Sequence, residues 1–235
     1  MKTLFILNLV LMSLVSFPSW GLAMEDLVLR EGIYYRKFTN KPFTGQITGD
    51  TEKGSIEKGA REGEWLKFHK NGQLWWIGSY QTNLKNGVWS GYSKDGNLVS
   101  KGSYLTGKKE GLWEYFNEGK LSEKGSYLND YQNGVWLTFH PSGVVAIKEN
   151  FRMSIREGPY EKYFSNGNVH STGNFKEGRK VGYWEYFYPN GNYHSKGSYG
   201  KYEQKEGEWI FFNPDQTKDL KNSGYFSRGY KIRDS

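Results

Sequence analysis

A glycine that returns at nearly constant intervals is the feature that most constrains this chain. Seven such glycines are separated by 24, 24, 23, 24, 24 and 25 residues: Gly63, Gly87, Gly111, Gly134, Gly158, Gly182 and Gly207. Two residues after each stands an aromatic anchor: Trp65, Trp89, Trp113, Trp136, Tyr160, Trp184 and Trp209. Three residues after each anchor stands a second aromatic: Phe68, Tyr92, Phe116, Phe139, Tyr163, Phe187 and Phe212. A period this regular indicates a repeat protein, in which each repeat is one supersecondary unit packed on its neighbours.

Each unit has the pattern of a β-hairpin. The anchor strand runs about six residues to a turn dipeptide such as Asn71-Gly72 or Asn190-Gly191, which tolerates the positive φ values of a two-residue hairpin turn. A second strand follows and closes on an aromatic: Tyr80, Tyr104, Tyr127, Phe151, Phe175, Tyr199 and Phe226. A connection rich in glycine and lysine then leads into the next unit.

Stacking of the units is required because a lone hairpin is marginal in water. Aromatic residues make up 17% of the chain against 36% for all hydrophobic residues, so ring burial must supply much of the stability. The sequence predicts an all-β fold: an elongated, solenoid-like antiparallel sheet of about seven stacked β-hairpin repeats with an N-terminal β cap. Residues three apart on a strand face opposite ways. Either both faces therefore carry aromatic rows, or every anchor strand is bulged.

The chain divides into four predicted parts. Residues 1–23 have the layout of a secretory signal peptide, with Lys2, an apolar run from Leu4 to Val15, and cleavage after Ala23. The other parts are an N-terminal capping segment (24–61), the repeat array (62–226, with units starting near 63, 87, 111, 134, 158, 182 and 207) and a C-terminal tail (227–235). We therefore expect an exported protein, either periplasmic or secreted. Because the chain has no cysteine, export does not depend on disulfides.

A family resemblance follows from the order of residues within a unit. The stretch GSYLTGKKEGLWEYFNEGKL, residues 102–121, resembles the MORN-repeat variant with its order G-x-Y-x-x-G-K-x-x-G-x-W-x-x-Y/F. The resemblance covers residues 62 to about 212, with a degenerate unit to Phe226. The segment LVLREGIYYRKFTNKPFTGQITG, residues 27–49, is similar to the opening segment of YwqK-like antitoxin-family chains. The resemblance implies a hairpin solenoid that binds rather than catalyses.

The candidate catalytic and cofactor motifs consist mostly of residues that recur at the same position in several units, which argues against a single catalytic or cofactor site. Gly102 to Gly107 followed by Lys108 approaches a phosphate-binding loop, but Lys109 stands where Ser or Thr should hold Mg²⁺. His170 and His194 occupy the same place in adjacent units, two strands or about 9.5 Å apart, which is too far to share a zinc ion. The carboxylates Glu114, Glu161 and Glu185 also share one repeat position. We therefore expect no enzyme, no catalytic residue, no cofactor and no metal.

The departures from the repeat give the candidate binding residues. Trp75 and Trp76 have no counterparts in other units, and adjacent strand residues face opposite ways, so at least one leaves the framework face. It is either an exposed binding anchor or packed against the N-terminal segment. The basic pairs Lys108-Lys109 and Arg179-Lys180 would suit an acidic protein, an anionic membrane or a cell-wall surface, or would serve only as solvated linkers. These six residues are the predicted partner-binding set.

A second departure lies where the fourth unit meets the fifth. Glu149 replaces the usual glycine there, and Pro159-Tyr160 replaces the usual pair that ends in Trp. The change either bends the array or is neutral drift.

Two binding functions fit this pattern. The first is a non-enzymatic exported scaffold for a protein partner, which the antitoxin resemblance would make a toxin. The alternative is a cell-envelope module that binds glycan, choline-like groups or lipid head groups, because aromatic-glycine hairpin repeats also resemble choline-binding repeats. Nucleic acid is not an expected partner, since predicted export removes the chain from most of it.

Overall fold

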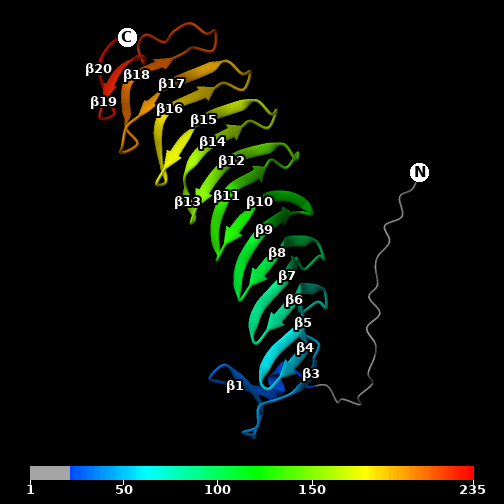
Figure 1. Cartoon of the computed structure of the whole chain (residues 1–235). Coiled ribbons are helices and arrows are strands. Elements are labelled where there is room, and N and C mark those ends of the chain that lie inside the picture. The colour runs from blue at the N-terminus through cyan, green and yellow to red at the C-terminus, as the bar shows by residue number, and fades with distance from the viewer. Residues whose placement is uncertain (1–21) are drawn as a thin grey trace, which may run out of the picture.

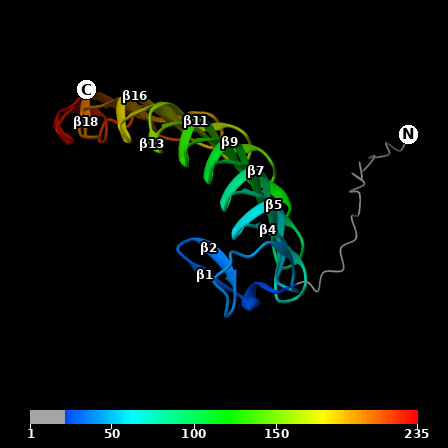
Figure 2. The ribbon, with the colours of Figure 1, turned by 60° about the horizontal axis from the view of Figure 1, so that its bottom comes forward.

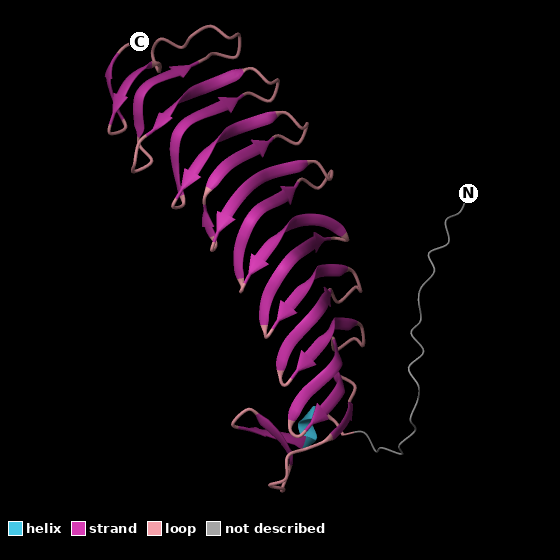
Figure 3. Cartoon of the chain, viewed as in Figure 1, coloured by secondary structure: helices cyan, strands magenta, loops and turns pink. Residues whose placement is uncertain are grey.

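The computed structural model describes residues 22–235 as an elongated, curved ribbon of antiparallel strands (Figures 1 and 3). Nearly all of the predicted signal peptide, residues 1–21, lies outside the described residues. Apart from the short 3-10 helix η1 (Met24–Asp26), the described elements are strands. No helix within residues 22–235 is long and apolar enough to cross a bilayer.

One long sheet runs from β3 to β20, and a separate two-stranded sheet pairs β1 (Leu27–Arg30) with β2 (Ile33–Arg36). The strands of the long sheet are β3 (Gly45–Thr48), β4 (Glu52–Glu57), β5 (Ala60–Phe68), β6 (Leu74–Gln81), β7 (Leu84–Tyr92), β8 (Leu98–Leu105), β9 (Lys108–Asn117), β10 (Lys120–Leu128), β11 (Tyr131–Phe139), β12 (Val145–Arg152), β13 (Ile155–Arg156), β14 (Gly158–Tyr163), β15 (Val169–Lys176), β16 (Arg179–Phe187), β17 (Tyr193–Tyr199), β18 (Lys205–Phe211), β19 (Gly224–Ser227) and β20 (Tyr230–Arg233). Neighbours in the chain pair antiparallel, except that β13 and β14 both pair with β12 and not with each other. No pairing within residues 22–235 joins β3 to β20, so the sheet is open. The predicted all-β array of stacked hairpins is confirmed.

The two edges of the sheet use different turns, with two exceptions: Glu118 and Gly119 form a two-residue turn on the Asn-Gly edge, and a three-residue loop with Glu203 at φ 60° joins β17 to β18 on the other edge. At one edge, two-residue turns have both residues at positive φ, as in Thr82 (47°) and Asn83 (66°) between β6 and β7. These are type I′ turns, whose twist matches that of the strands. They occupy the connections between predicted units, so the array is a continuous meander.

The prediction of two-residue turns at the Asn-Gly dipeptides is wrong. His69 N donates to Gln73 O at 2.8 Å, and Gly72 N donates to His69 O at 2.9 Å, which encloses a three-residue loop. Of these loop residues only Gly72 has a positive φ, 83°. This is a type I turn followed by a left-handed glycine. Two residues after Gln73, Trp75 has no partner in the paired strand and shifts the register between Lys67 and Phe68.

Both faces of the sheet carry aromatic rows. The anchors and the residues two positions on share one face, named here the Trp face: the Trp113 and Tyr115 rings stack with centroids 6.0 Å apart. The aromatics three positions after the anchors lie on the other, outer face, where Phe187 stacks on Tyr193 at 4.9 Å. Anchor strands are also bulged, but at the spacing glycine before the anchor, as the register shift opposite Gly134 shows. The bulge therefore does not bring the second aromatic onto the Trp face.

The core of the Trp face is a ladder of rings on glycines. Each tryptophan anchor is between 0 and 5% exposed. Trp113 lies against Gly102 of the paired strand so closely that a Cβ there would fall 2.2 Å from Cδ2 of the indole. Its edges meet Tyr104 at 5.1 Å and Tyr127 at 6.1 Å, both in edge-to-face geometry. Each anchor therefore joins its own unit to the preceding one.

The N-terminal segment covers the start of the Trp face. Leu27, Ile47, Ile56 and Trp65 form a buried cluster there, and the β1–β2 hairpin lies on the inner side of the curve (Figure 2). Of the predicted capping segment 24–61, strands β3 and β4 already extend the long sheet. At the other end, the predicted tail contains strand β20.

The junction between the fourth and fifth units interrupts the ladder. Within the described chain, Phe151 contacts Trp136 and Tyr160 contacts Phe175, but no ring contact joins Phe151 to Tyr160. The buried Glu149 forms an ion pair with Arg156 at this point, at 2.5 Å. Strands β13 and β14 both pair with β12, so the sheet itself continues.

Candidate functional site

A row of cations follows the Trp face. The residue two positions before the spacing glycine is basic in six of the seven units: Arg61, Lys85, Lys109, Arg156, Lys180 and Lys205, with Gln132 in the remaining unit. We name these six residues the cation row. In its four lysines, Nζ lies 4.3–5.0 Å from the centroid of the anchor ring of the same unit. Each cation thus sits on a ring face, where the ring quadrupole attracts it.

The strand register places these lysines. Lys109 pairs across strands with Tyr104, and its Nζ also lies 4.8 Å from the ring of Tyr127 in the next strand. Paired residues share one face of a sheet, so each lysine lies between the closing aromatics of two units. The side chain is held in place before any ligand arrives.

Burial shifts the pKa values of lysine and tyrosine side chains on the Trp face. It lowers the pKa of Lys85, Lys109 and Lys205, because the charged form loses hydration. Lys109 Nζ donates to Tyr115 Oη at 2.7 Å, and Tyr115 Oη lies 3.1 Å from Tyr127 Oη. Burial, followed by this contact with Tyr127, raises the pKa of Tyr115. At neutral pH the face therefore presents ammonium groups beside neutral tyrosine hydroxyls.

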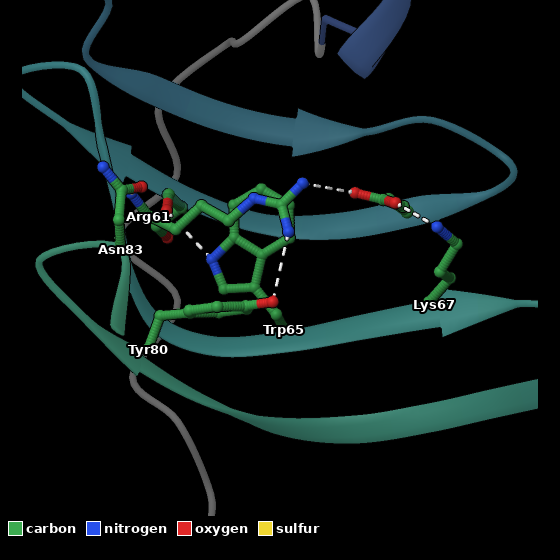
Figure 4. A network of polar contacts seen from close by, with 7 residues as sticks. Arg61, Trp65, Lys67, Tyr80 and Asn83 are labelled. Atoms are coloured by element: carbon green, nitrogen blue, oxygen red, sulfur yellow. Dashed lines mark hydrogen bonds and ion pairs between the residues drawn. The ribbon is translucent and has the colours of Figure 1, made fainter. Parts of the chain in front are cut away.

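The first cation of the row is neutralised by its surroundings. Figure 4 shows Arg61 between Trp65 and Tyr80, with a guanidinium nitrogen 3.0 Å from a carboxylate oxygen of Glu52. Lys67 Nζ binds the other oxygen of Glu52 at 2.8 Å. Arg61 thus stabilises the capped end of the sheet, and the four lysines are the charges that are free of carboxylate ion pairs among the described residues.

The structure separates Trp75 from Trp76. Trp76 lies on the Trp face, 4.9 Å from the ring of Trp89, and packs beside the N-terminal cluster, so the packing alternative holds for it. Trp75 is the extra residue at the register shift, 46% exposed, and stacks on His69 at 5.3 Å. It lines a groove of about 570 Å³ beside the turn that contains Asn71. Trp75 is therefore the more exposed of the two tryptophans, while Trp76 is partly buried and lines the hollow of the second unit.

Each predicted basic pair is divided between two environments. Lys109 and Lys180 belong to the cation row. Lys108 lies exposed beside the two-residue turn, and the guanidinium of Arg179 lies 6.0 Å from the ring of Tyr202. Sequence reasoning chose these residues as runs of adjacent charges and missed Lys85, Lys205, Arg156 and the row itself. The available signal was their constant position two residues before the spacing glycine.

Two hollows open on the Trp face where a ring is missing. Two positions after the anchor, Tyr186 of the sixth unit faces Ser195 across the strands. The second unit instead has Gly91 facing Ser100, which leaves a hollow of about 200 Å³ beside Lys85. The fifth unit has Lys162 facing Ser171, which leaves one of about 270 Å³.

The geometry defines a class of protein: an open array of β-hairpin repeats that offers a long continuous surface. Five segments match the MORN repeat variant, at residues 61–81, 85–105, 132–153, 156–177 and 180–201. The array is therefore built of MORN-variant repeats, which confirms the predicted resemblance to that repeat, while the similarity to YwqK-like antitoxin-family chains stays a prediction; MORN repeats mediate binding to proteins or to membrane phospholipid. The five matches leave out two of the seven units, those that contain Trp113 and Trp209, although the Trp113 unit has the same ring geometry as the matched units. No curated protein matches the chain in sequence.

Proposed function

We propose that this chain is a non-catalytic, exported repeat scaffold that binds an extended acidic segment of a protein partner along the Trp face. The cation row is the observation that carries the proposal. Its lysines are pre-positioned on rings, so binding loses little side-chain entropy. The full chain carries a net charge of +7, and cleavage after Ala23 would remove only Lys2, so the mature chain would carry +6, which would also speed the approach of an acidic partner. Under the antitoxin resemblance, that partner is an exported toxin with an acidic segment.

The spacing of the row sets the partner's pattern. Successive units are two strands apart, about 9.6 Å, and an extended peptide rises about 3.3 Å per residue. A peptide running along the array therefore passes one position of the row every three residues or so. The free cations lie in two pairs, Lys85 with Lys109 and Lys180 with Lys205, because Gln132 is uncharged and Arg61 and Arg156 are paired with carboxylates. Acidic residues at every third position match both pairs in register, whereas clustered acidic residues reach only one or two cations.

A pair of peptides tests this pattern directly. One of about fifteen residues carries glutamate at every third position, and its isomer has the same composition with the glutamates adjacent, the length being chosen to span about 50 Å. We expect the spaced peptide to bind the mature chain at least about tenfold more tightly, by roughly 1.4 kcal/mol. Equal affinity of the two isomers would contradict the proposal.

The lysines of the row are tested by matched substitutions. Replacing Lys85, Lys109, Lys180 and Lys205 with methionine keeps the packing on the rings and removes four charges. The control chain replaces four exposed lysines away from the row, Lys70, Lys94, Lys101 and Lys176, with methionine. The spaced peptide should bind the control like the parent and the row variant weakly. The same three chains then serve as baits for an envelope-plus-periplasm extract.

The same three bait chains distinguish the envelope-binding alternative from the protein-partner proposal. The β1–β2 hairpin packs on the Trp face through Leu27 and lies on the inner side of the curve (Figure 2), so the Trp face is the concave one and a flat bilayer would reach the row poorly. Capture of only lipid or wall material, equally by all three chains, would reject the protein-partner proposal in favour of the envelope module.

A further inference from the structure

The hollow in the fifth unit differs from the rest of the Trp face in its charge. It has a volume of about 270 Å³ and is lined by Arg156, Lys162, His170 and Lys180, with the rings of Tyr160, Phe175, Trp184 and Tyr186. The hollow in the second unit has Lys85 as its one basic residue. The fifth unit therefore gathers three permanent cations and a histidine around one small cavity.

Two substitutions in the repeat create this cavity. Where Tyr186 fills the space opposite Ser195, the fifth unit has Lys162 opposite Ser171, so no ring occupies the position. The anchor is also a tyrosine, whose ring is smaller than the indole of the other units. The floor of the cavity remains aromatic because Tyr160 lies 5.6 Å from Trp184.

The charge inside the cavity is only partly neutralised. Arg156 pairs with Glu149, so three cations less one carboxylate leave about two positive charges near the cavity at neutral pH. Lys180 Nζ donates to Tyr186 Oη at 3.1 Å, and Lys162 has no carboxylate ion pair within the described residues. His170 Nδ1 lies 3.2 Å from Ser171 Oγ, and burial followed by the charge of Lys162 lowers the pKa of His170. The histidine is thus mostly neutral near pH 7 and supplies a hydrogen bond rather than a charge.

We propose that this cavity binds a single sugar ring that carries a phosphomonoester. The phosphate brings a charge of roughly −1.5 to −2 at pH 7, which matches the excess of positive charge. Arginine and lysine are the usual binders of such groups. The cavity is slightly smaller than the roughly 300 Å³ at which pockets for drug-sized ligands begin, so one ring fits and a dinucleotide does not. Tyr160 and Tyr186 offer apolar walls to the ring, while Ser171 and His170 offer partners to its hydroxyls.

This site shares Arg156 and Lys180 with the cation row, but Lys162 and His170 lie outside the row. The proposal therefore stands or falls separately from the acidic-segment proposal. The variant Lys162→Tyr exploits the repeat itself, because it recreates the arrangement of Tyr186 opposite Ser195. It fills the cavity without leaving a buried charge unpaired, so it should fold as stably as the parent.

Calorimetric titration of the mature chain with glucose 6-phosphate, glucose and inorganic phosphate tests the site at physiological salt. We expect glucose 6-phosphate to bind at least about tenfold more tightly than inorganic phosphate, and glucose alone to bind most weakly. Lys162→Tyr and Lys162→Met should each weaken the binding of glucose 6-phosphate by about tenfold or more. Lys101→Met, at an exposed lysine outside both the cation row and the cavity, should leave it unchanged.

The same ring could arrive free or at the end of an envelope glycan. A phosphorylated disaccharide distinguishes the sources: tighter binding than the monosaccharide indicates a glycan end, and equal binding indicates the free sugar phosphate. Unchanged affinity for glucose 6-phosphate in folded Lys162→Tyr would overturn the site. If the parent chain binds glucose 6-phosphate but does not bind the spaced acidic peptide, the proposed function is rejected and the sugar-phosphate site is retained.

Discussion

At the scale of single residues, the contact between an indole and a glycine holds the array together. The absence of a Cβ at Gly102 lets the ring of Trp113 lie on the backbone, and the same contact recurs at Gly54, Gly78, Gly125, Gly173 and Gly197. The ring in turn donates from Nε1 to a carbonyl of the paired strand, which for Trp113 is Ser103 O at 3.0 Å. The glycine is thus needed for space, independently of any special φ value.

Substitution at this contact should be costly. Gly102→Ala would place a Cβ 2.2 Å from the Trp113 ring, so the indole or the strand must shift, and we expect a loss of about 3 kcal/mol of unfolding free energy. Gly91→Ala is the control, because its Cβ would meet only the movable Ser100 hydroxyl at 2.9 Å, and it should change stability by less than about 1 kcal/mol. Urea denaturation measures both; equal losses would refute the role assigned to the glycine.

The buried tyrosine hydroxyls predict a loss of stability in alkali. The pKa of Tyr115 is raised in the folded state by burial and by Tyr127, so its contribution is fully present below pH 10.0 and declines as the pH rises above that value. A single such group contributes at most about 1.4 kcal/mol per pH unit, and less here because the ring is partly exposed. The stability advantage of the parent over Tyr115→Phe should therefore shrink above pH 10 in urea titrations.

Compared with Tyr115, the dependence of stability on pH has the opposite sign for Lys109. Its pKa is lowered in the folded state, chiefly by burial, so the unfolded chain binds the proton more tightly and stability rises with pH up to 10.5. The stability of the parent relative to Lys109→Met should therefore be lowest near pH 7, where the cost of desolvating the ammonium is fully present, and should rise as the pH approaches 10.5. A difference that is constant between pH 7 and 10.5 would show that the ammonium is not desolvated.

At the scale of elements, the hairpin was predictable from the sequence, but the type of turn at its Asn-Gly dipeptide was not. Period, anchors and strand alternation depend on local sequence, so the stacked antiparallel sheet followed directly from them. The turn type did not, because Asn-Gly suits both a two-residue type I′ turn and the end of a three-residue loop. The non-glycine pair Met153 and Ser154 forms a type I′ turn with φ of 51° and 64°, which propensity alone disfavours. The cross-strand pairing of whole hairpins overrides that preference.

The candidate site was less predictable than the fold. Lys109 and Lys180 were chosen for their neighbours in sequence, although their function as a row depends on cross-strand register. The hollows depend on what faces Gly91 and Lys162 on the next strand, which composition does not reveal. Aligning the units by the spacing glycine would have recovered the row, but not the cavity.

Removal of one whole unit should leave a folded protein. Deleting residues 111–133 joins Glu110 to Gly134 in the same repeat position, so the strands on either side keep their direction and their neighbours. We expect a β-sheet circular dichroism spectrum and a urea m value lower by about a tenth, in proportion to the surface lost. Deleting residues 111–121 removes a single strand instead and should disrupt pairing. A folded second variant with an unfolded first would contradict the hairpin unit.

At the scale of the whole molecule, the junction at Phe151 and Tyr160 divides the array. Coupling between repeats acts through nearest neighbours, so the interrupted ring ladder should let the two halves open separately. In hydrogen exchange we expect β5 to β12 and β14 to β19 to behave as two units of different stability.

Restoring the repeat at the junction tests this division. The double substitution Glu149→Gly with Tyr160→Trp recreates the glycine-indole contact and should merge the two exchange units into one. Glu149→Gly alone removes the partner of Arg156 and opens space beside Tyr160, and should destabilise the chain. A single exchange unit in the parent would show that the junction is as strongly coupled as the others.

The constant length of the units has a consequence for how such a protein changes over evolutionary time. An in-frame duplication of about 24 codons adds two strands and carries the next lysine about 9.6 Å farther along the face. Existing neighbours keep their contacts except at the insertion point. The number of repeats therefore sets the length of the binding face, and with it the longest partner segment that the protein can bind.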